Sequence, residues 1–352
     1  VLTVMSVLAP GLSAPIPTPV GTITLRMVVV YGAAAFVLVV GAGAAAMVGH
    51  LRPSERQVTY SRPDSWFETL RTAHANPASA ALVLAPLAVG GVASSHATGH
   101  HPVVSLLAGY VAWGLPVGVV AVRRARVDDA KDREIQEFVH AVSGHVGLGR
   151  PFGEAVAVVA EDVELGPLQE DVASLAFDLS LSDGPEGTDR RTAALSRFVD
   201  RVGTPLAAQT MGLVTGALDA GSDTEAVFET LQTEVGQLYH EKQSLRSELS
   251  VYIAVGWVTA LLVVGIVVAV DQYVLDGFAQ LSAMPGSTGF ALDPNAVDPA
   301  RERFRFAVVA GATAVAAGWF AGMASRGPYD ALLHSSLLGA LVALVFAGVG
   351  LA

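Results

Sequence analysis

The sequence predicts an all-α, polytopic membrane protein with about six transmembrane helices and a cytoplasmic six-helix bundle. Of its 352 residues, 52% are hydrophobic and only 15% are charged, whereas soluble domains carry about 25% charged residues. Several uncharged apolar stretches approach the ~20 residues that an α-helix needs to cross a ~30 Å hydrocarbon core. No segment alternates apolar and polar residues with period two for long, so strands are not expected.

Six stretches are expected to span the membrane. They are residues 23–48, 78–93, 103–122, 251–270, 304–324 and 334–351. These spans form two membrane regions, 23–122 and 251–352, with the helical module 123–250 between them. Residues 1–22 contain four prolines and are expected to form a loosely ordered tail.

The distribution of arginine predicts the orientation of the chain. Cytoplasmic segments next to membrane spans carry an excess of Lys and Arg. Arginines occur in the 49–77 loop and directly after the third span, at Arg123, Arg124 and Arg126. We therefore expect the 49–77 loop and the module to lie in the cytoplasm, and the loop 271–303 to lie outside a cell membrane.

The module contains most of the charge. Residues 123–250 hold 23 of the 32 acidic and 12 of the 21 basic residues. The module therefore has a net charge of −11, the same as that of the whole chain. Only Lys131 and Lys242 are lysines. An acidic, lysine-poor surface is typical of a protein from the salty cytosol of a halophile, such as a haloarchaeon, although a GC-rich genome also favours arginine. An acidic module lacks the basic patch that nucleic acids require, so no nucleic-acid partner is expected.

Periodicity and capping signals predict six helices in the module. The expected helices cover residues 128–146, 151–162, 167–181, 188–202, 205–220 and the helix that begins at residue 222. Gly147 and Gly149 are expected to end the first helix, and Pro151 suits the first turn of the second. Thr204 followed by Pro205 is a helix cap followed by proline at the first helical position.

The sixth helix of the module is expected to run without a break from residue 221 to residue 273. Ser222 and Glu225 match the S-x-x-E capping box. The residues that follow at spacings of 3 and 4 form a seam of period 3.5. These seam residues are Phe228, Leu231, Val235, Leu238, Lys242, Leu245 and Leu249, followed by Tyr252. Lys242 is the polar exception, interpreted either as a side chain at the edge of the core or as a partner contact. Residues 251–270 carry no charge, so the helix should enter the membrane directly.

No motif for catalysis or cofactor binding is found. The chain has no cysteine, which excludes disulfides, thiolate zinc sites and cysteine nucleophiles. Neither Gly41-Ala42-Gly43 nor Gly147-Leu148-Gly149 has the GxxxxGK[ST] form of a nucleotide-binding loop. The first is interpreted as a helix-packing site in the membrane and the second as a turn between helices. G-x-S-x-G and HExxH motifs are also missing, so we expect no enzyme activity, no cofactor and no metal site.

Two groups of histidines are interpreted as surface residues. His96, His100 and His101 share one turn, but no carboxylate or thiolate lies near them in sequence. His140 and His145 are five residues apart, which does not place them on one face of a helix.

Two segments of the module give it a family resemblance. Residues 147–156, which read GLGRPFGEAV, and residues 217–227, which read ALDAGSDTEAV, resemble helix-entry turns of the type II secretion system F domain. This domain belongs to the platform proteins of type II secretion and type IV pilus systems, including those of archaeal pili and archaella. The run 322–335, with Gly327 and His334, is also similar to archaeal members.

The resemblance covers residues 50–352, with two departures. Bacterial members usually carry two such modules and this chain has one, so it is expected to pair with itself or with a sister F-domain subunit. In addition, Thr224 stands where the family has leucine at the entry of the last helix.

The resemblance implies a mechanical function without catalysis. A platform protein of this family binds a hexameric assembly ATPase in the cytoplasm and helps to lift pilin-like subunits out of the membrane lipid into a filament. The residues expected at the ATPase contact are exposed charges at the two helix-entry turns. They are Arg150 and Glu154 at the first turn, and Asp219, Asp223 and Glu225 at the second. The alternatives are a membrane transporter or channel subunit with a cytoplasmic regulatory bundle, and a membrane-tethered enzyme.

Overall fold

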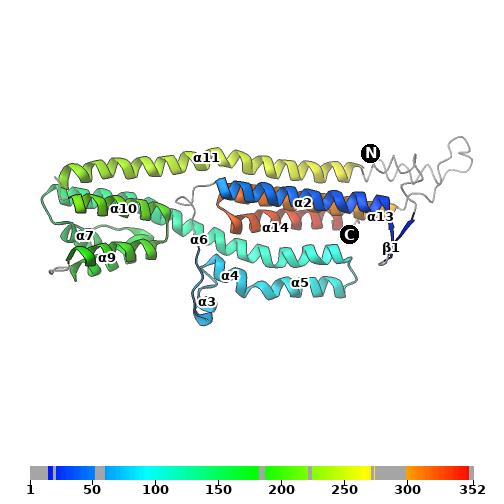
Figure 1. Cartoon of the computed structure of the whole chain (residues 1–352), viewed down its shortest axis with the longest axis horizontal. Helices are drawn as coiled ribbons and strands as arrows, with labels where there is room; N and C mark the ends of the chain where they lie inside the picture. Colours follow the sequence, from blue (N-terminus) through cyan, green and yellow to red (C-terminus); the bar gives the residue numbers. More distant parts are fainter. Residues whose placement is uncertain are drawn as a thin grey trace, which may run out of the picture.

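The computed structural model describes residues 15–18, 21–51, 60–181, 187–220, 224–270, 273 and 299–348. In this part of the chain the structure is a long all-helical molecule with the module at one end and a bundle of apolar helices at the other (Figure 1). The all-α class is therefore confirmed. One short exception is a hairpin of β1 (Pro15–Thr18) and β2 (Gly21–Thr24), which pair antiparallel with Ile16 opposite Ile23. The expectation of no strand is wrong here, because four residues are too few to show a period-two pattern.

Five helices are long and apolar enough to cross a membrane. The helices concerned are α2 (Leu25–Leu51), α6 (Pro102–Gly147), α11 (Thr224–Val270), α13 (Pro299–Ser325) and α14 (Pro328–Gly348). A sixth span is formed if α4 (Pro77–Val83) and α5 (Ala85–Ala97) are counted together, since they meet at a bend of 41°. Pro86 lies in the first turn of α5, where it has no N–H to donate to the preceding turn.

Helix α13 forms the centre of the membrane bundle. Half of its apolar window is buried, compared with 6% for α2 and 17% for α11. Small residues allow its neighbours to approach closely: Gly318 and Gly322 contact Ser335 and Ala331 of α14, and Gly41 of α2 contacts Ala316. The Gly41 packing site is confirmed, whereas Gly43 faces open space.

The outer surface of the bundle is apolar. Large side chains are exposed along α2, α5 and α11, including Phe36, Val39, Val89, Val258 and Leu262, at 61–71% of their full area. In water such a surface would drive association, so it is the surface expected to face lipid.

The six predicted helices of the module are confirmed. Besides the ends of α6 and α11, they are α7 (Phe152–Asp162), α8 (Gln169–Ser180, preceded by the 3-10 turn Gly166–Leu168), α9 (Gly187–Val202) and α10 (Pro205–Ala220). Gly149 has φ of 84° in the turn after α6, a conformation that favours glycine. Thr204 Oγ1 accepts a hydrogen bond from the N–H of Ala207, as a helix cap should.

The core of the module is a single cluster contributed by all six helices. Its largest fully buried side chains are Phe138, Phe198, Ile135, Leu165 and Leu168. The rings of Phe138 and Phe198 lie 6.0 Å apart, which joins α6 to α9. Burying such side chains contributes about 1.5–3 kcal/mol each and holds the helices together.

Two predicted boundaries are corrected. The third span and the first helix of the module are one helix, α6, because the arginines at 123–126 continue the helix instead of ending it. The last span begins at Pro328, not at His334, since Gly327 makes the turn with φ of 132° and the proline then opens α14. Helix α3 (Trp66–Thr72) lies in the 49–77 loop, where no helix was expected.

Candidate coupling site

The helices α6 and α11 both run from the module into the membrane bundle, and in the module they lie side by side and antiparallel (Figure 1). Their facing residues pair in regular order, since His140 meets Gln232, Asp132 meets Lys242 and Asp129 meets Arg246. The continuity of α11 is thereby confirmed from Thr224 to Val270. The capping residues Ser222 and Glu225 lie outside the described backbone and side chains respectively.

The carboxylate of Asp129 joins three elements. Its Oδ1 accepts a hydrogen bond from Arg246 of α11 at 2.7 Å, and its Oδ2 accepts one from Arg326, in the turn between α13 and α14, at 2.6 Å. Arg326 thus adds a charged contact to the packing of α6 and α11 against α13 and α14, where Gly118 of α6 meets Leu333 and Gly256 of α11 meets Ala321. The carboxylate of Asp129 is therefore shared by α11 and the α13–α14 turn.

The charge state of Asp129 is set by these neighbours. Burial alone would raise the pKa of its carboxyl group. The hydrogen bond from Arg246 and the positive charges of Arg326 and Lys242 outweigh burial, so the pKa lies below its usual value. Asp129 is therefore ionised at neutral pH, which keeps both charge-assisted hydrogen bonds in place.

Asp132 and Lys242 form a second pair, one turn deeper in the module. The side chain of Asp132 is 2% exposed and that of Lys242 is 38% exposed. Lys242 thus reaches from the seam to a buried carboxylate on α6. This contact explains the one polar position in the predicted seam, and it agrees with the interpretation of Lys242 as a residue at the edge of the core.

Asp128 contacts Tyr60 and Arg124. Its Oδ2 accepts a hydrogen bond from the hydroxyl of Tyr60 at 2.8 Å, and its Oδ1 lies 2.9 Å from Nε of Arg124. Burial raises the pKa of Asp128, and burial together with the Asp128 charge raises the pKa of Tyr60. Tyr60 precedes α3, so this contact ties the segment before α3 to α6.

A cavity of about 860 Å³ opens where these contacts meet. Its walls are apolar on one side, with Leu51, Leu245 and Leu249, and polar on the other, with Asp128, Asp129 and Arg326.

The residues predicted at the ATPase contact lie at the end of the module that is farther from the membrane bundle, as far as the structure describes them. Arg150 and Glu154 are exposed at the turn between α6 and α7. Asp219 lies in α10 and Glu225 in α11, with side chains outside the description, and Asp223 is outside the described residues. None of these five residues takes part in the charged contacts at the junction.

The predicted seam is buried at one described position. Val235 is fully buried. Leu238 and Leu249 are half-buried and line the cavity, and Leu245 is 38% exposed. Leu238 is therefore only partly covered, at the edge of the cavity. Phe228 and Leu231 belong to α11, but their side chains are outside the description.

Sequence reasoning missed Asp129, Arg246 and Arg326 as a group. The sequence does contain a pattern that involves Asp129 and Arg246. One helix has acidic residues at 128, 129 and 132, and another has basic residues at 242 and 246, each set with helical spacing. This pattern could not be used without knowing that these helices are neighbours.

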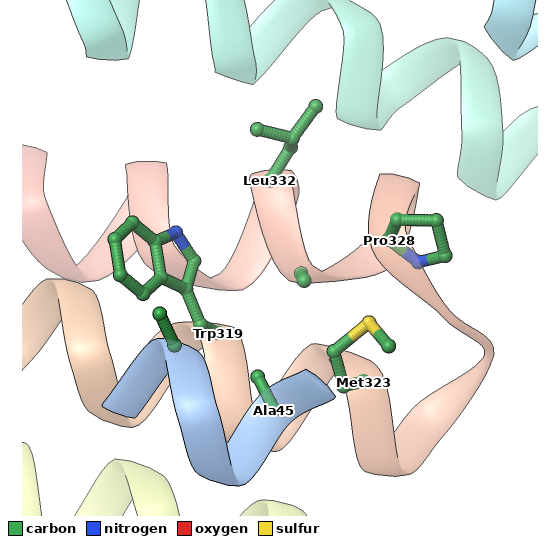
Figure 2. A pocket seen from close by; sticks show the side chains of 7 residues that line it. Ala45, Trp319, Met323, Pro328 and Leu332 are labelled. Carbon is green, nitrogen blue, oxygen red and sulfur yellow. The ribbon is translucent and has the colours of Figure 1, made fainter. Parts of the chain in front are cut away.

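Two further places were tested as binding sites. An apolar hollow of about 260 Å³ lies between α2, α13 and α14, and Figure 2 shows Ala45, Trp319, Met323 and Leu332 around it. The indole N–H of Trp319 is already donated to the hydroxyl of Tyr110 at 2.8 Å, so the hollow offers no polar group for a cofactor. Among the described residues, no three His, Cys, Asp or Glu side chains gather as metal ligands would.

The histidine turn has structural contacts. His101 accepts a hydrogen bond from the N–H of Val103 at the start of α6, and its ring lies 4.3 Å from that of Phe304 of α13. His100 lies 2.8 Å from the hydroxyl of Thr98. These contacts close the α5–α6 turn and connect it to α13.

No family model matches the chain, and neither a curated protein nor a solved structure is similar enough to it to count as a match.

Proposed function

We propose that the chain is the membrane platform protein of a type IV pilus or type II secretion-like machine. In this role it binds a cytoplasmic assembly ATPase through the far end of the module, and it passes the resulting movement to the membrane bundle, where pilin-like subunits are extracted. The platform itself carries out no reaction. Besides the resemblance of the two helix-entry turns, the proposal is supported mainly by the Asp129 contacts, which join both long helices to the turn of α13 and α14.

Two helices make the module and the bundle one mechanical unit. At 1.5 Å per residue, the 46 residues of α6 and the 47 residues of α11 each extend over about 70 Å without a break. A force applied at the α6–α7 turn therefore reaches the membrane through continuous helices. A hinge at a flexible linker would absorb such a force.

The arginine distribution supports a cytoplasmic module. Arg62, Arg71 and Arg124 lie at the module-side end of the bundle, next to α3 and α6. Arg301, Arg303 and Arg305 lie at the opposite end, at the start of α13, and Arg26 lies at the start of α2. The orientation rests on the larger group at the module side, which also contains Arg123, Arg126 and Arg326.

Site-specific crosslinking tests the ATPase contact. A photoreactive amino acid at Arg150 or Glu154 should crosslink the assembly ATPase of the source organism in cells. The same amino acid at His100, which is exposed at the opposite end of the bundle, should not. If neither module position captures a secretion-type ATPase, and a deletion strain keeps normal surface filaments, the proposal is wrong.

A transporter or channel subunit is the second candidate. It is favoured by Asp330, a carboxylate that is 7% exposed in the first turn of α14 and lines the cavity. Buried charges in membrane segments often belong to transport paths. Solute uptake by purified protein in vesicles that is lost on Asp330→Asn would support this candidate and count against the platform.

A further inference from the structure

Helix α3 exposes an apolar surface that no other part of the described chain covers. Trp66, Phe67 and Leu70 are 64%, 72% and 53% exposed. At 100° per residue, these three side chains fall within one sector of about 100° around the helix, and Glu68 and Thr72 occupy the opposite side. Helix α3 is thus amphipathic, with its apolar side turned outward.

The orientation of α3 is fixed by the burial of Thr69 and by the contact of Thr72 with α4. Thr69 is 1% exposed and donates to the carbonyl of Ser65 at 3.0 Å. The hydroxyl of Thr72 lies 3.0 Å from that of Ser79 in α4. Asn76 donates to the carbonyl of Ser61 at 2.8 Å, which closes the segment into a loop. The outward position of the apolar side is therefore a feature of the fold.

The position of α3 relative to the membrane bundle indicates what covers it. Figure 1 shows α3 at the module-side end of α4 and α5, turned away from the long axis of the bundle. The helices that follow α3 also expose apolar side chains: Leu82 of α4 and Leu87 and Val89 of α5 are 38%, 45% and 71% exposed, on the surface expected to face lipid. The apolar side of α3 thus continues the lipid-facing surface at the level where the bilayer meets water.

We propose that α3 lies in the headgroup region of the bilayer on the module side, with Trp66, Phe67 and Leu70 inserted among the upper acyl chains. Tryptophan is enriched at this depth because its ring is apolar and its N–H can bond to headgroups. Arg71 borders the apolar sector, so its stem can lie along the acyl chains while its guanidinium contacts a lipid phosphate. This inference is independent of the platform function.

The lipid contact sets the position of the junction relative to the bilayer. Tyr60, six residues before Trp66, donates its hydroxyl to Asp128. Helix α3 therefore connects the bilayer surface to α6 at the point where α6 also contacts α11 and Arg326. It holds the charged junction at a constant depth just outside the hydrocarbon.

The absence of cysteine from the sequence allows a direct depth measurement. Single cysteines are placed at Phe67 and, as a matched control on the opposite side of the same helix, at Glu68. Val89 serves as the lipid reference and Leu148, which is 79% exposed on the module, as the water reference. Each full-length variant carries a nitroxide label in vesicles of phosphatidylcholine and phosphatidylglycerol, and its collisions with oxygen and with a water-soluble nickel chelate are compared.

The proposal predicts that the label at Phe67 collides more often with oxygen than with nickel, as at Val89, and that the label at Glu68 does the reverse. Leu70→Cys provides the same reading if Phe67→Cys does not fold. A label at Phe67 that collides with nickel as often as the one at Leu148 overturns the proposal, because α3 then faces water. Protection from both reagents also overturns it, because a protein then covers α3.

Discussion

Asp129 of α6 accepts hydrogen bonds from Arg246 of α11 and from Arg326 of the α13–α14 turn, through its two separate oxygens. The two arginines come from segments that are far apart in the chain, the long helix α11 and the α13–α14 turn. The stability and the function of this contact can be separated by experiment, because the module contains a second, more buried ion pair away from the junction. That pair joins Lys131 to Asp171 of α8 at 2.5 Å.

Asp129→Asn is expected to lower the free energy of unfolding by only about 1 kcal/mol. Arg246 and Arg326 are 48% and 31% exposed, and ion pairs in contact with water contribute little. Asp171→Asn should cost more, since Lys131 and Asp171 are 12% and 13% exposed. Thermal unfolding followed by far-ultraviolet circular dichroism gives both values. A larger loss for Asp129→Asn than for Asp171→Asn would show that the junction is a structural core.

The contribution of Asp129 to the free energy of unfolding should depend on pH only at acidic pH. Its pKa in the folded protein lies below the usual value, so its stabilising effect is complete above the unfolded pKa of about 4 and is lost as the pH falls through the lower folded pKa. The difference in unfolding free energy between the wild type and Asp129→Asn should be constant from pH 6 to pH 8 (about 2–4 units above the unfolded pKa). A difference that changes within that range contradicts the assigned charge state.

Lys242→Met should destabilise the module by about 2 kcal/mol, because it leaves the buried carboxylate of Asp132 without its cation. The value is placed below that of a fully buried pair because Lys242 is 38% exposed. The double variant Asp132→Asn with Lys242→Met should recover most of the loss, since the uncompensated charge is gone. If the two single changes simply add, Lys242 and Asp132 do not interact.

Val235 and Leu238 should differ strongly in their tolerance of a charge. Val235→Asp places a carboxylate in a fully buried site and should cost more than about 3 kcal/mol, because no partner is available. Leu238→Asp should cost less, since Leu238 borders the cavity and its new carboxylate can be hydrated. Chemical denaturation of the two variants compares them. Equal losses would mean that the cavity is closed to water.

The helices of the module could be predicted from sequence because their ends carry local signals. Gly149 and the Thr204-Pro205 pair mark termini with the chemistry that the structure uses. The start of α14 at Pro328 lies six residues before the predicted His334. The carboxylate of Asp330 in this first turn accepts a hydrogen bond from Ser325.

The junction could not be predicted, for a physical reason. Its partners are far apart in the chain: Arg246 lies 117 residues from Asp129, and Arg326 lies 197 residues away. Helical periodicity shows which residues share a face, but only packing decides which faces meet. Helix α3 was missed for a different reason, since seven residues are too few for a periodic pattern to stand out from a polar loop.

The central claim is that the Asp129 contacts transmit movement from the module to the membrane bundle. It is tested most directly by counting surface filaments in cells that carry Asp129→Asn or the control Asp171→Asn, with crosslinking of the ATPase at Arg150 measured in both. The account predicts that both variants keep the crosslink, and that only Asp129→Asn loses the filaments. Wild-type filament numbers in Asp129→Asn, with the crosslink intact, would contradict it.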